Sequence, residues 1–130
     1  MPQNQLFEYA VIRIVPRVDR EEFTNAGVIL FCKKSDFLKS KCFFDKARLS
    51  LLYPFLDTDE IEHIEKQLNT FNSISDGSAQ DSAIARLDKA SRFRWLTATR
   101  STVIQTSKVH PGLSSDCEKT LDCIFDQMAG

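Results

Sequence analysis

Apolar positions in the first third of the chain fall into three short blocks, at residues 9–15, 26–32 and 37–44. The first two blocks are rich in β-branched residues and apolar on both faces, which is typical of buried strands. The third block alternates Lys39 and Lys41 with smaller or apolar residues, and such outward lysines indicate an edge strand. The three blocks therefore predict an antiparallel meander.

Helical spacing of apolar residues begins after the third block. Asp45 is placed to cap a short helix with Leu49 and Leu52 facing inward, and Pro54 limits its length. A longer helix is predicted next, because a capping box precedes an apolar stripe at helical spacing. Its capping residues are Asp57 and Glu60, and its stripe consists of Ile61, Ile64, Leu68 and Phe71.

Two further helices and one loop are expected in the second half. Residues 73–80 are the single linker-like stretch and predict a mobile loop. A short helix should begin at Asp81 and run through Ile84 and Leu87. The chain closes with another predicted helix, which has Ser115 and Glu118 at capping-box spacing and Leu121, Ile124, Phe125 and Met128 at helical spacing.

Between these helices, residues 92–96 and 101–109 alternate in polarity and predict two more strands. In an extended 92–96 segment, the two arginines point to one side and Phe93 and Trp95 to the other. The Pro-Gly pair at 111–112 should end the last strand. The sequence thus predicts an α+β fold, a small antiparallel sheet with helices packed on one face.

Composition is consistent with one packed domain over residues 1–130. This length is near the commonest domain size, and 42% hydrophobic residues with ten Phe supply a core. A formal charge of −1 and a pI near 6.1 argue against broad, sequence-independent binding to nucleic acid.

The cysteines and the N-terminal sequence bear on compartment and cofactors. The four cysteines show no CxxC spacing, so they indicate neither a zinc site nor a disulfide framework. The N-terminus lacks a signal-peptide pattern, and no apolar run approaches membrane-spanning length. We therefore expect a cytoplasmic protein with reduced thiols, no metal and no cofactor.

Charge is unevenly distributed along the chain. Residues 89–115 contain five basic residues and no acidic one, while the rest holds twelve basic and eighteen acidic side chains. A cationic, hydroxyl-rich segment in a mildly acidic protein is the natural place to look for a bound anion or an acidic partner. Its basic residues are Lys89, Arg92, Arg94, Arg100 and Lys108.

Arg92 and Arg94, projecting from one face close to Arg100 in sequence, form the main candidate site. Guanidinium groups bind phosphate or carboxylate oxygens in pairs, and small hydroxyls add further donors. His110 is a weak catalytic candidate because it can exchange a proton near neutral pH. The alternative is that these arginines form ion pairs with the chain's own carboxylates. The sequence leaves both interpretations, a ligand site and structural ion pairs, open. The hydroxyl-bearing candidates are Thr99, Ser101 and Thr102.

Two arginines of the first strand form a second candidate group. Arg13 interrupts an otherwise apolar strand, and a buried guanidinium needs an anion beside it. A neighbouring carboxylate is favoured over a ligand for this role. Arg17 follows Pro16 at the strand end and is freer to face a ligand. The carboxylates closest in sequence to Arg13 are Glu8, Glu21 and Glu22.

No sequence motif identifies a reaction. Glycine-rich phosphate loops, GxSxG and HExxH are absent, and His63 and His110 alone cannot build a His-rich metal centre. Cys32 and Cys42 are interpreted as core or strand positions rather than nucleophiles. Trp95 is expected in the core rather than as a platform for stacked bases.

Residues 9–31 (YAVIRIVPRVDREEFTNAGVILF) and 92–113 (RFRWLTATRSTVIQTSKVHPGL) resemble the two signature blocks of the bacterial domain-of-unknown-function family 3037, DUF3037. The likeness extends from residue 9 to about residue 125, and the segment from 42 to 80 departs most from the family pattern. The matching positions are Arg13, Pro16, Arg17, Phe23, Asn25, Gly27, Val28, Arg92, Phe93, Trp95, Leu96, Arg100, Ser101, His110 and Gly112.

What the resemblance implies is a family without an established activity. Its genes often neighbour one that encodes a HipA-like kinase-fold protein, which implies an accessory or partner role. We therefore expect a non-catalytic binding or accessory module that uses a cationic, arginine-rich surface to bind a protein partner, with the HipA-like protein as its candidate.

The alternative is an enzyme or sensor that binds a phosphorylated or carboxylated small molecule through an arginine cluster, with His110 as acid or base. It predicts that the cluster's side chains converge in one pocket. Nucleic-acid binding ranks third because of the net negative charge, and no membrane partner is expected. The candidate site residues are Arg13, Arg17, Arg92, Arg94, Arg100, Ser101, Thr102 and His110.

Overall fold

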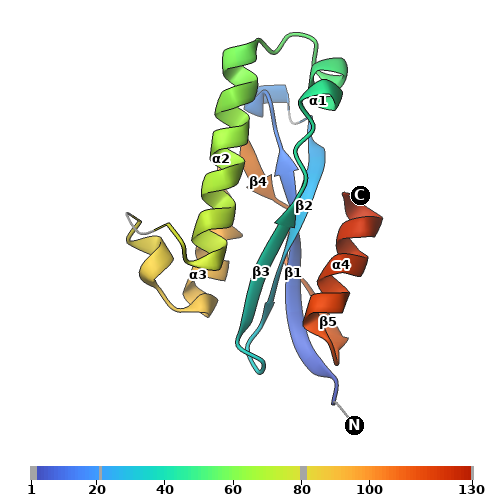
Figure 1. The fold of residues 1–130 in the computed structure, drawn as a ribbon, viewed down its shortest axis with the longest axis vertical. Helices are drawn as coiled ribbons and strands as arrows, with labels where there is room; N and C mark the ends of the chain where they lie inside the picture. Colours follow the sequence, from blue (N-terminus) through green and yellow to red (C-terminus); the bar gives the residue numbers. More distant parts are fainter. Residues whose placement is uncertain (1–2, 21, 80–81, 130) are drawn as a thin grey trace.

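The computed structural model describes residues 3–20, 22–79 and 82–129. Within them the chain forms a five-stranded antiparallel sheet with helices on both sides (Figure 1). Its strands are β1 (Gln5–Ile14), β2 (Thr24–Cys32), β3 (Phe37–Cys42), β4 (Ile104–Thr106) and β5 (His110–Ser114). The helices are α1 (Lys46–Leu52), α2 (Thr58–Asp76), α3 (Lys89–Leu96) and α4 (Cys117–Met128), with 3-10 turns η1 (Val18–Arg20) and η2 (Ile84–Arg86).

The predicted meander is confirmed and forms the centre of the sheet. β2 lies between β1 and β3, with Tyr9 paired to Leu30 on one side and Gly27 paired to Cys42 on the other. A β-bulge interrupts the β1–β2 register between Ile12 and the following arginine. The α+β class, the antiparallel sheet and the single small domain are confirmed as well.

The two faces of the sheet carry separate apolar cores. Ile29 and Phe31 of β2 belong to the larger core, which α1, α2 and α3 cover. Val28 and Leu30 belong to a smaller core with α4 on the opposite face. The expectation that helices pack on one face therefore holds for α1–α3 and not for α4, because a strand that is apolar on both faces needs cover on both (Figure 1).

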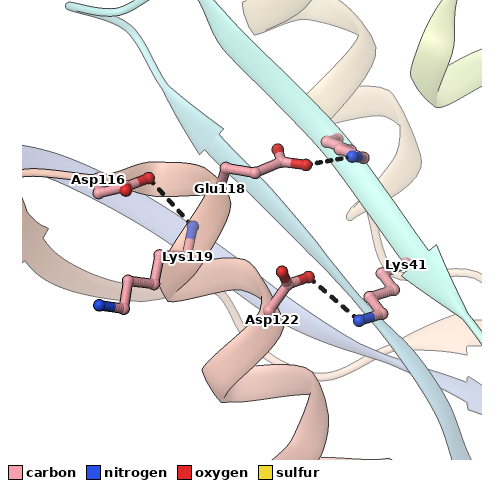
Figure 2. Close-up of polar contacts among 6 residues, drawn as sticks. Lys41, Asp116, Glu118, Lys119 and Asp122 are labelled. Atoms are coloured by element: carbon pink, nitrogen blue, oxygen red, sulfur yellow. Dashed lines mark hydrogen bonds and ion pairs between the residues drawn. The ribbon is translucent and has the colours of Figure 1, made fainter.

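Helix α4 is held on the sheet by buried apolar residues and by two ion pairs. Leu121 is fully buried, and Phe125 packs in the same core. Glu118 pairs with Lys39, and Asp122 pairs with Lys41 at 3.1 Å. Figure 2 shows the second pair between α4 and β3. The edge-strand lysines therefore pair with α4. Each exposed ion pair contributes at most about 1 kcal/mol, so apolar burial is the larger contribution.

Asp side chains cap the four α-helices, as the sequence predicted for α1 and α2. Asp45 accepts from the Arg48 backbone N–H at 3.1 Å, and the capping box of α2 is complete. The cap of α4 is Asp116 rather than the predicted Ser115, because it is the Asp carboxylate that reaches the Lys119 N–H (Figure 2). In α1, Leu49 is buried as predicted, whereas Leu52 is exposed.

The strand predicted at residues 92–96 is wrong, because these residues form helix α3. Asp88 caps the helix by accepting from the Ser91 N–H, and Phe93 and Leu96 then face the core together at helical spacing. Phe93 is fully buried and stacks on Phe31 with ring centroids 5.4 Å apart. Trp95, expected in the core, lies on the outer side and is 39% exposed.

The predicted strand at 101–109 is also wrong in its bounds. Only Ile104–Thr106 form β4, and the Pro-Gly pair lies inside β5 rather than ending a strand. Proline is tolerated there because β5 is a sheet-edge strand, where a missing backbone donor costs little. Gly112 is required by close packing, since a Cβ at this position would lie 2.4 Å from the Phe7 ring.

β4 and β5 share the outer edge of β1. β5 pairs with residues 5–9 and β4 with residues 12–14. Between them Ser107 bonds Val11 twice: its N–H donates to the Val11 carbonyl, and its hydroxyl accepts from the Val11 N–H, both at 2.8 Å. One serine therefore bridges the break between two short strands.

The predicted loop at 73–80 is shorter than expected. α2 continues to Asp76, and Gly77 ends it in the left-handed conformation with φ of 79°. Of the other predicted positions, Gln80 and the start of the next helix at Asp81 lie outside the described residues. Residues 84–86 form the 3-10 turn η2, and the mobility of the loop stays a prediction.

The helical assignment of α3 predicts unequal effects for its two aromatic residues. Phe93→Ala should lower the free energy of unfolding by about 3–5 kcal/mol, because it opens a cavity in the larger core. Trp95→Ala should cost only about 1 kcal/mol, because the indole is partly in solvent. Urea unfolding of both variants checks this, and equal losses would favour a strand that buries both rings.

Candidate functional site

The predicted arginine site does not form as one cluster. Each of its arginines contacts a different part of the molecule, and the contacts differ in kind. These partners decide which of the guanidinium groups are free to bind a ligand.

Arg92 is a structural residue of the α2–α3 junction. It is 9% exposed, and its guanidinium donates to the carbonyls of Leu87 at 2.9 Å and Ser75 at 3.3 Å. The left-handed turn at Gly77 passes beside it, with the ideal Cβ position 3.7 Å from Arg92 Nη1. Its bonds hold the end of α2 against the start of α3. Two of its donors are therefore committed to backbone acceptors.

Arg94 lies on another side of α3 and forms a bidentate ion pair with Glu8 of β1. The two N–O distances are 2.8 and 2.6 Å. The hydrogen bond to Glu8 raises the pKa of Arg94 above its usual range. A helical turn of 100° per residue places Arg92 and Arg94 about 200° apart, so they do not act as one fork.

Arg13 packs on an aromatic ring, and no carboxylate among the described residues forms an ion pair with it. Its guanidinium carbon lies 4.1 Å from the centre of the Phe23 ring, next to the β-bulge of β1. Of the carboxylates expected to neutralise it, Glu8 pairs with Arg94, and Glu21 lies outside the described residues. The cation–π contact is therefore the interaction that orients Arg13.

Arg17 lies in a groove between the end of β1 and the first turns of α2. It pairs with Glu60 at 2.6 Å and stacks 4.7 Å above the Phe55 ring. The groove encloses about 270 Å³, and its walls also include Asp57, Asp59 and His63. Three carboxylates and one guanidinium make this groove acidic, so its electrostatics do not suit an anionic ligand.

Arg100 lies beside Trp95 over a second, smaller groove. The guanidinium is 4.1 Å from the indole centre and donates to the Trp95 carbonyl. Burial lowers the pKa of Arg100 from its ordinary value. The groove encloses about 110 Å³ and includes Thr102, whose hydroxyl donates to the Ile104 carbonyl at 2.7 Å. Small-molecule sites usually enclose about 300 Å³ or more, so this one is undersized.

The other two predicted site residues are separate from these grooves. His110 begins β5, is exposed, and lies against Tyr9 with ring centroids 5.4 Å apart. Ser101 is exposed in the connection to β4. Neither residue lines the groove of Arg17 or that of Arg100. The structure therefore brings Arg100 and Thr102 together but not the full predicted set.

The structure reveals a surface that charge counting missed. Large apolar side chains are exposed around α1 and the adjoining strand ends, from 39% for Phe55 to 83% for Leu51. We call this the α1 surface. It consists of Phe23, Phe43, Leu51, Leu52, Phe55 and Met128. Phe43 and the pair Leu51–Leu52 are its sequence signal, because a short helix buries one face, here through Leu49, and leaves apolar residues on its other sides in solvent.

Two adjoining hollows connect parts of the α1 surface into a groove between α1 and the end of α4. One includes Phe43 and Leu52, the other includes Phe23 and Met128, and Arg48 lines both. The second hollow encloses about 260 Å³. In Figure 1, α1 and the C-terminal end of α4 both lie toward the upper end of the sheet, although the two helices pack on opposite faces of it. Thr24, Asn25 and Arg48 add polar walls to the second hollow, and such a mixture of apolar, polar and arginine groups is common at protein-binding surfaces.

Together, the fold and these surfaces define a small α+β protein whose sheet lies between helices on both faces. Among the described residues, no group of three or more potential metal ligands occurs. No helix in the described ranges has the length and apolar character required to cross a membrane.

The family model described as a protein of unknown function, DUF3037, matches residues 9–129, so the chain belongs to this family. The resemblance of the two sequence blocks is thereby confirmed. No curated protein and no solved structure matches the chain.

The different contacts of Arg92 and Arg94 predict different costs on removal. Arg92→Ala should lower the free energy of unfolding by about 1.5–3 kcal/mol, because two backbone carbonyls lose a charged donor. Arg94→Ala should cost at most about 1 kcal/mol, because its ion pair is partly solvated. Urea unfolding measures both, and the reverse order would contradict a structural role for Arg92.

The Arg17–Glu60 pair predicts a dependence of stability on pH. The hydrogen bond from Arg17 holds the pKa of Glu60 below its ordinary value of 4.5. A lowered carboxyl pKa in the folded state stabilises the protein above that ordinary value, and this contribution is lost as the pH falls through the folded-state pKa.

Glu60→Gln keeps the acceptor for the Asp57 N–H of the capping box but removes the charge. Between neutral and acid pH, its unfolding free energy should therefore fall less than that of the wild type. Glu62→Gln on the same helix is the control and should follow the wild type. If all three proteins lose stability in parallel, the ion pair contributes nothing measurable.

Proposed function

We propose that this protein is a non-catalytic binding module that docks a protein partner on its α1 surface. The observation that supports the proposal most is the concentration of exposed large apolar residues at this one end. Exposed apolar groups of this extent, next to a cation-lined groove, are typical of protein–protein contacts.

Arg13, Arg20 and Arg48 adjoin the α1 surface and give it a charge preference, whereas Glu60 balances the charge of the neighbouring Arg17. Arg13 stacks on Phe23, and both Arg17 and Arg20 stack on Phe55, at 4.7 and 5.1 Å respectively. Arg48 lines the groove between α1 and α4. Arginine and aromatic residues are enriched among the residues that dominate binding energy. The partner that fits this surface is an amphipathic protein segment carrying acidic side chains.

The cationic segment at 89–115 is a weaker candidate for the docking surface. Lys89 pairs with Asp36 at 3.1 Å, Arg94 pairs with Glu8, and Arg92 is buried. Its charges therefore serve mostly to hold α3 to the rest of the molecule. Of the predicted site residues, Arg13 and Arg17 are the ones that adjoin the α1 surface.

The alternative, an arginine cluster that grips a phosphorylated or carboxylated small molecule, receives little support from the geometry. The groove of Arg17 is acidic and the groove of Arg100 is small. His110 lines neither, so the acid–base residue expected for this function does not lie beside the guanidinium in either groove. We therefore favour the binding module.

The first partner to test is the HipA-like kinase-fold protein that the family's gene neighbourhood implies. Both full-length proteins are mixed at micromolar concentration, and complex formation is measured by mass photometry and calorimetry. We expect a complex that Leu51→Glu weakens by about tenfold or more, because a charge is then placed in an apolar contact.

Leu113→Glu is the matched control. Leu113 is also highly exposed but lies on β5, away from α1, so this variant should bind like the wild type. Thermal unfolding establishes that both variants are folded. No complex between the wild-type proteins would remove this partner, and a complex weakened only by Leu113→Glu would place the docking surface elsewhere.

A further inference from the structure

Two buried cysteines meet where α4 begins on the sheet. Cys32 is the last residue of β2, and Cys117 is the first residue of α4. Both belong to the smaller apolar core, where Cys32 is fully buried and Cys117 is 8% exposed. The two positions are distant in sequence, and neither is part of the α1 surface.

The turn between β2 and β3 supplies polar groups to this cysteine pair. The Ser35 hydroxyl of this turn lies 3.8 Å from the Cys117 sulfur. Strand β1 supplies acceptors to the other thiol, because Cys32 donates to Gln5 Oε1 and to the Leu6 carbonyl, both at 3.4 Å. The turn is anchored from outside, because Lys89 donates to the Asp36 carbonyl at 2.6 Å. The thiols therefore lie in an ordered polar pocket at the edge of an apolar core.

The surroundings make the two thiols unequal. Burial alone would raise the pKa of Cys32, but hydrogen bonds from Ser35, from the Cys117 thiol and from the Lys34 backbone outweigh it and lower the pKa. Burial raises the pKa of Cys117. Cys32 is thus the preferred thiolate and Cys117 its proton-donating neighbour, an asymmetry that is common in reactive dithiols.

A surface hollow lies beside the pair and is lined by Cys117, with the fully buried Cys32 behind it. It encloses about 580 Å³ and is lined by Gln5, Ser35, Phe37, Cys117 and Lys119, among others. Of these residues, Gln5 accepts a hydrogen bond from the Cys32 thiol, and the Ser35 hydroxyl lies 3.8 Å from the Cys117 sulfur. A small oxidant in the hollow therefore reaches the residues that surround the thiolate.

We propose that Cys32 and Cys117 form a reversible disulfide when the protein meets hydrogen peroxide. The Cys32 thiolate attacks one peroxide oxygen, the O–O bond breaks, and the released hydroxide takes a proton to become water. Cys32 is then a sulfenic acid. The Cys117 sulfur attacks the Cys32 sulfur, the S–S bond forms and the S–O bond breaks. The leaving hydroxide takes the Cys117 proton, so two thiols and one peroxide give one disulfide and two waters.

The other two cysteines provide internal controls. Cys42 lies in the larger core, donates to Asn72 at 3.2 Å, and has a pKa raised to about 12 by burial. Cys123 is exposed on α4. A half-buried thiol with a raised pKa and an exposed thiol therefore accompany the pair in the same chain.

The disulfide would fasten the start of α4 to the end of β2 and close a long loop of chain. A cross-link of this span restricts the unfolded state and should raise the melting temperature by on the order of 10 °C. Oxidation would therefore stabilise the attachment of α4, and reduction would release it. This inference does not depend on the proposed docking function.

The test uses the full-length protein, treated with an equal amount of hydrogen peroxide and then denatured and alkylated. Tryptic peptides are separated without reduction. We expect residues 21–33 and 109–119 to be recovered as one linked pair, with Cys42 and Cys123 alkylated. The melting temperature should rise and return to its starting value after dithiothreitol.

Two variants isolate the steps. Cys123→Ser should form the link as the wild type does. Cys117→Ser should stop at the sulfenic acid on Cys32, which dimedone traps. If Cys117→Ser fails to fold, the peptide map of the wild-type protein still decides the question. Alkylation of both Cys32 and Cys117 after peroxide, or a link that involves Cys123, would overturn the proposal.

Discussion

Strand β2 has no polar face, and the arrangement of the rest of the structure follows from this. A strand that is apolar on both faces must be covered on both, or it leaves apolar surface in water. α2 and α3 cover one face together with α1, and α4 covers the other. The order of β1, β2 and β3 keeps this strand away from the sheet edges. Because α4 must cross to the far face, its first residue meets the end of β2, which brings two thiols together.

Local sequence signals were sufficient to predict an element where no second signal in the same residues favoured a different structure. The apolar blocks predicted β1–β3, and the Asp57–Glu60 capping box predicted the start of α2. They were insufficient at residues 92–96, where alternating charge fits a strand but Asp88 and the Phe93–Leu96 spacing fit a helix. The Asp88 cap and the stacking of Phe93 on Phe31 favour the helix. The stacking could not be predicted from residues 92–96 alone, because Phe31 is distant in the sequence.

The candidate site was less predictable than the fold, because a guanidinium's partner is chosen in three dimensions. Arg94 pairs with Glu8 from the other end of the chain, and the buried donors of Arg92 bind carbonyls that no side-chain pattern indicates. A count of basic residues cannot separate such structural charges from free ones. The exposed Leu51 and Phe43 were visible in the sequence, but their lack of cover follows only from the shortness of α1 and its position at one end of the sheet.

The bridge that Ser107 makes to Val11 has a consequence for self-association. Open sheet edges are templates for pairing with other molecules, which leads to aggregation. Within the described residues, β1 has its outer edge closed by two short strands with a serine hydroxyl between them. The opposite edge strand, β3, carries lysines already engaged by α4. Neither side therefore offers a long, flat and uncharged edge, which protects a small sheet with apolar faces from strand-to-strand aggregation at high concentration.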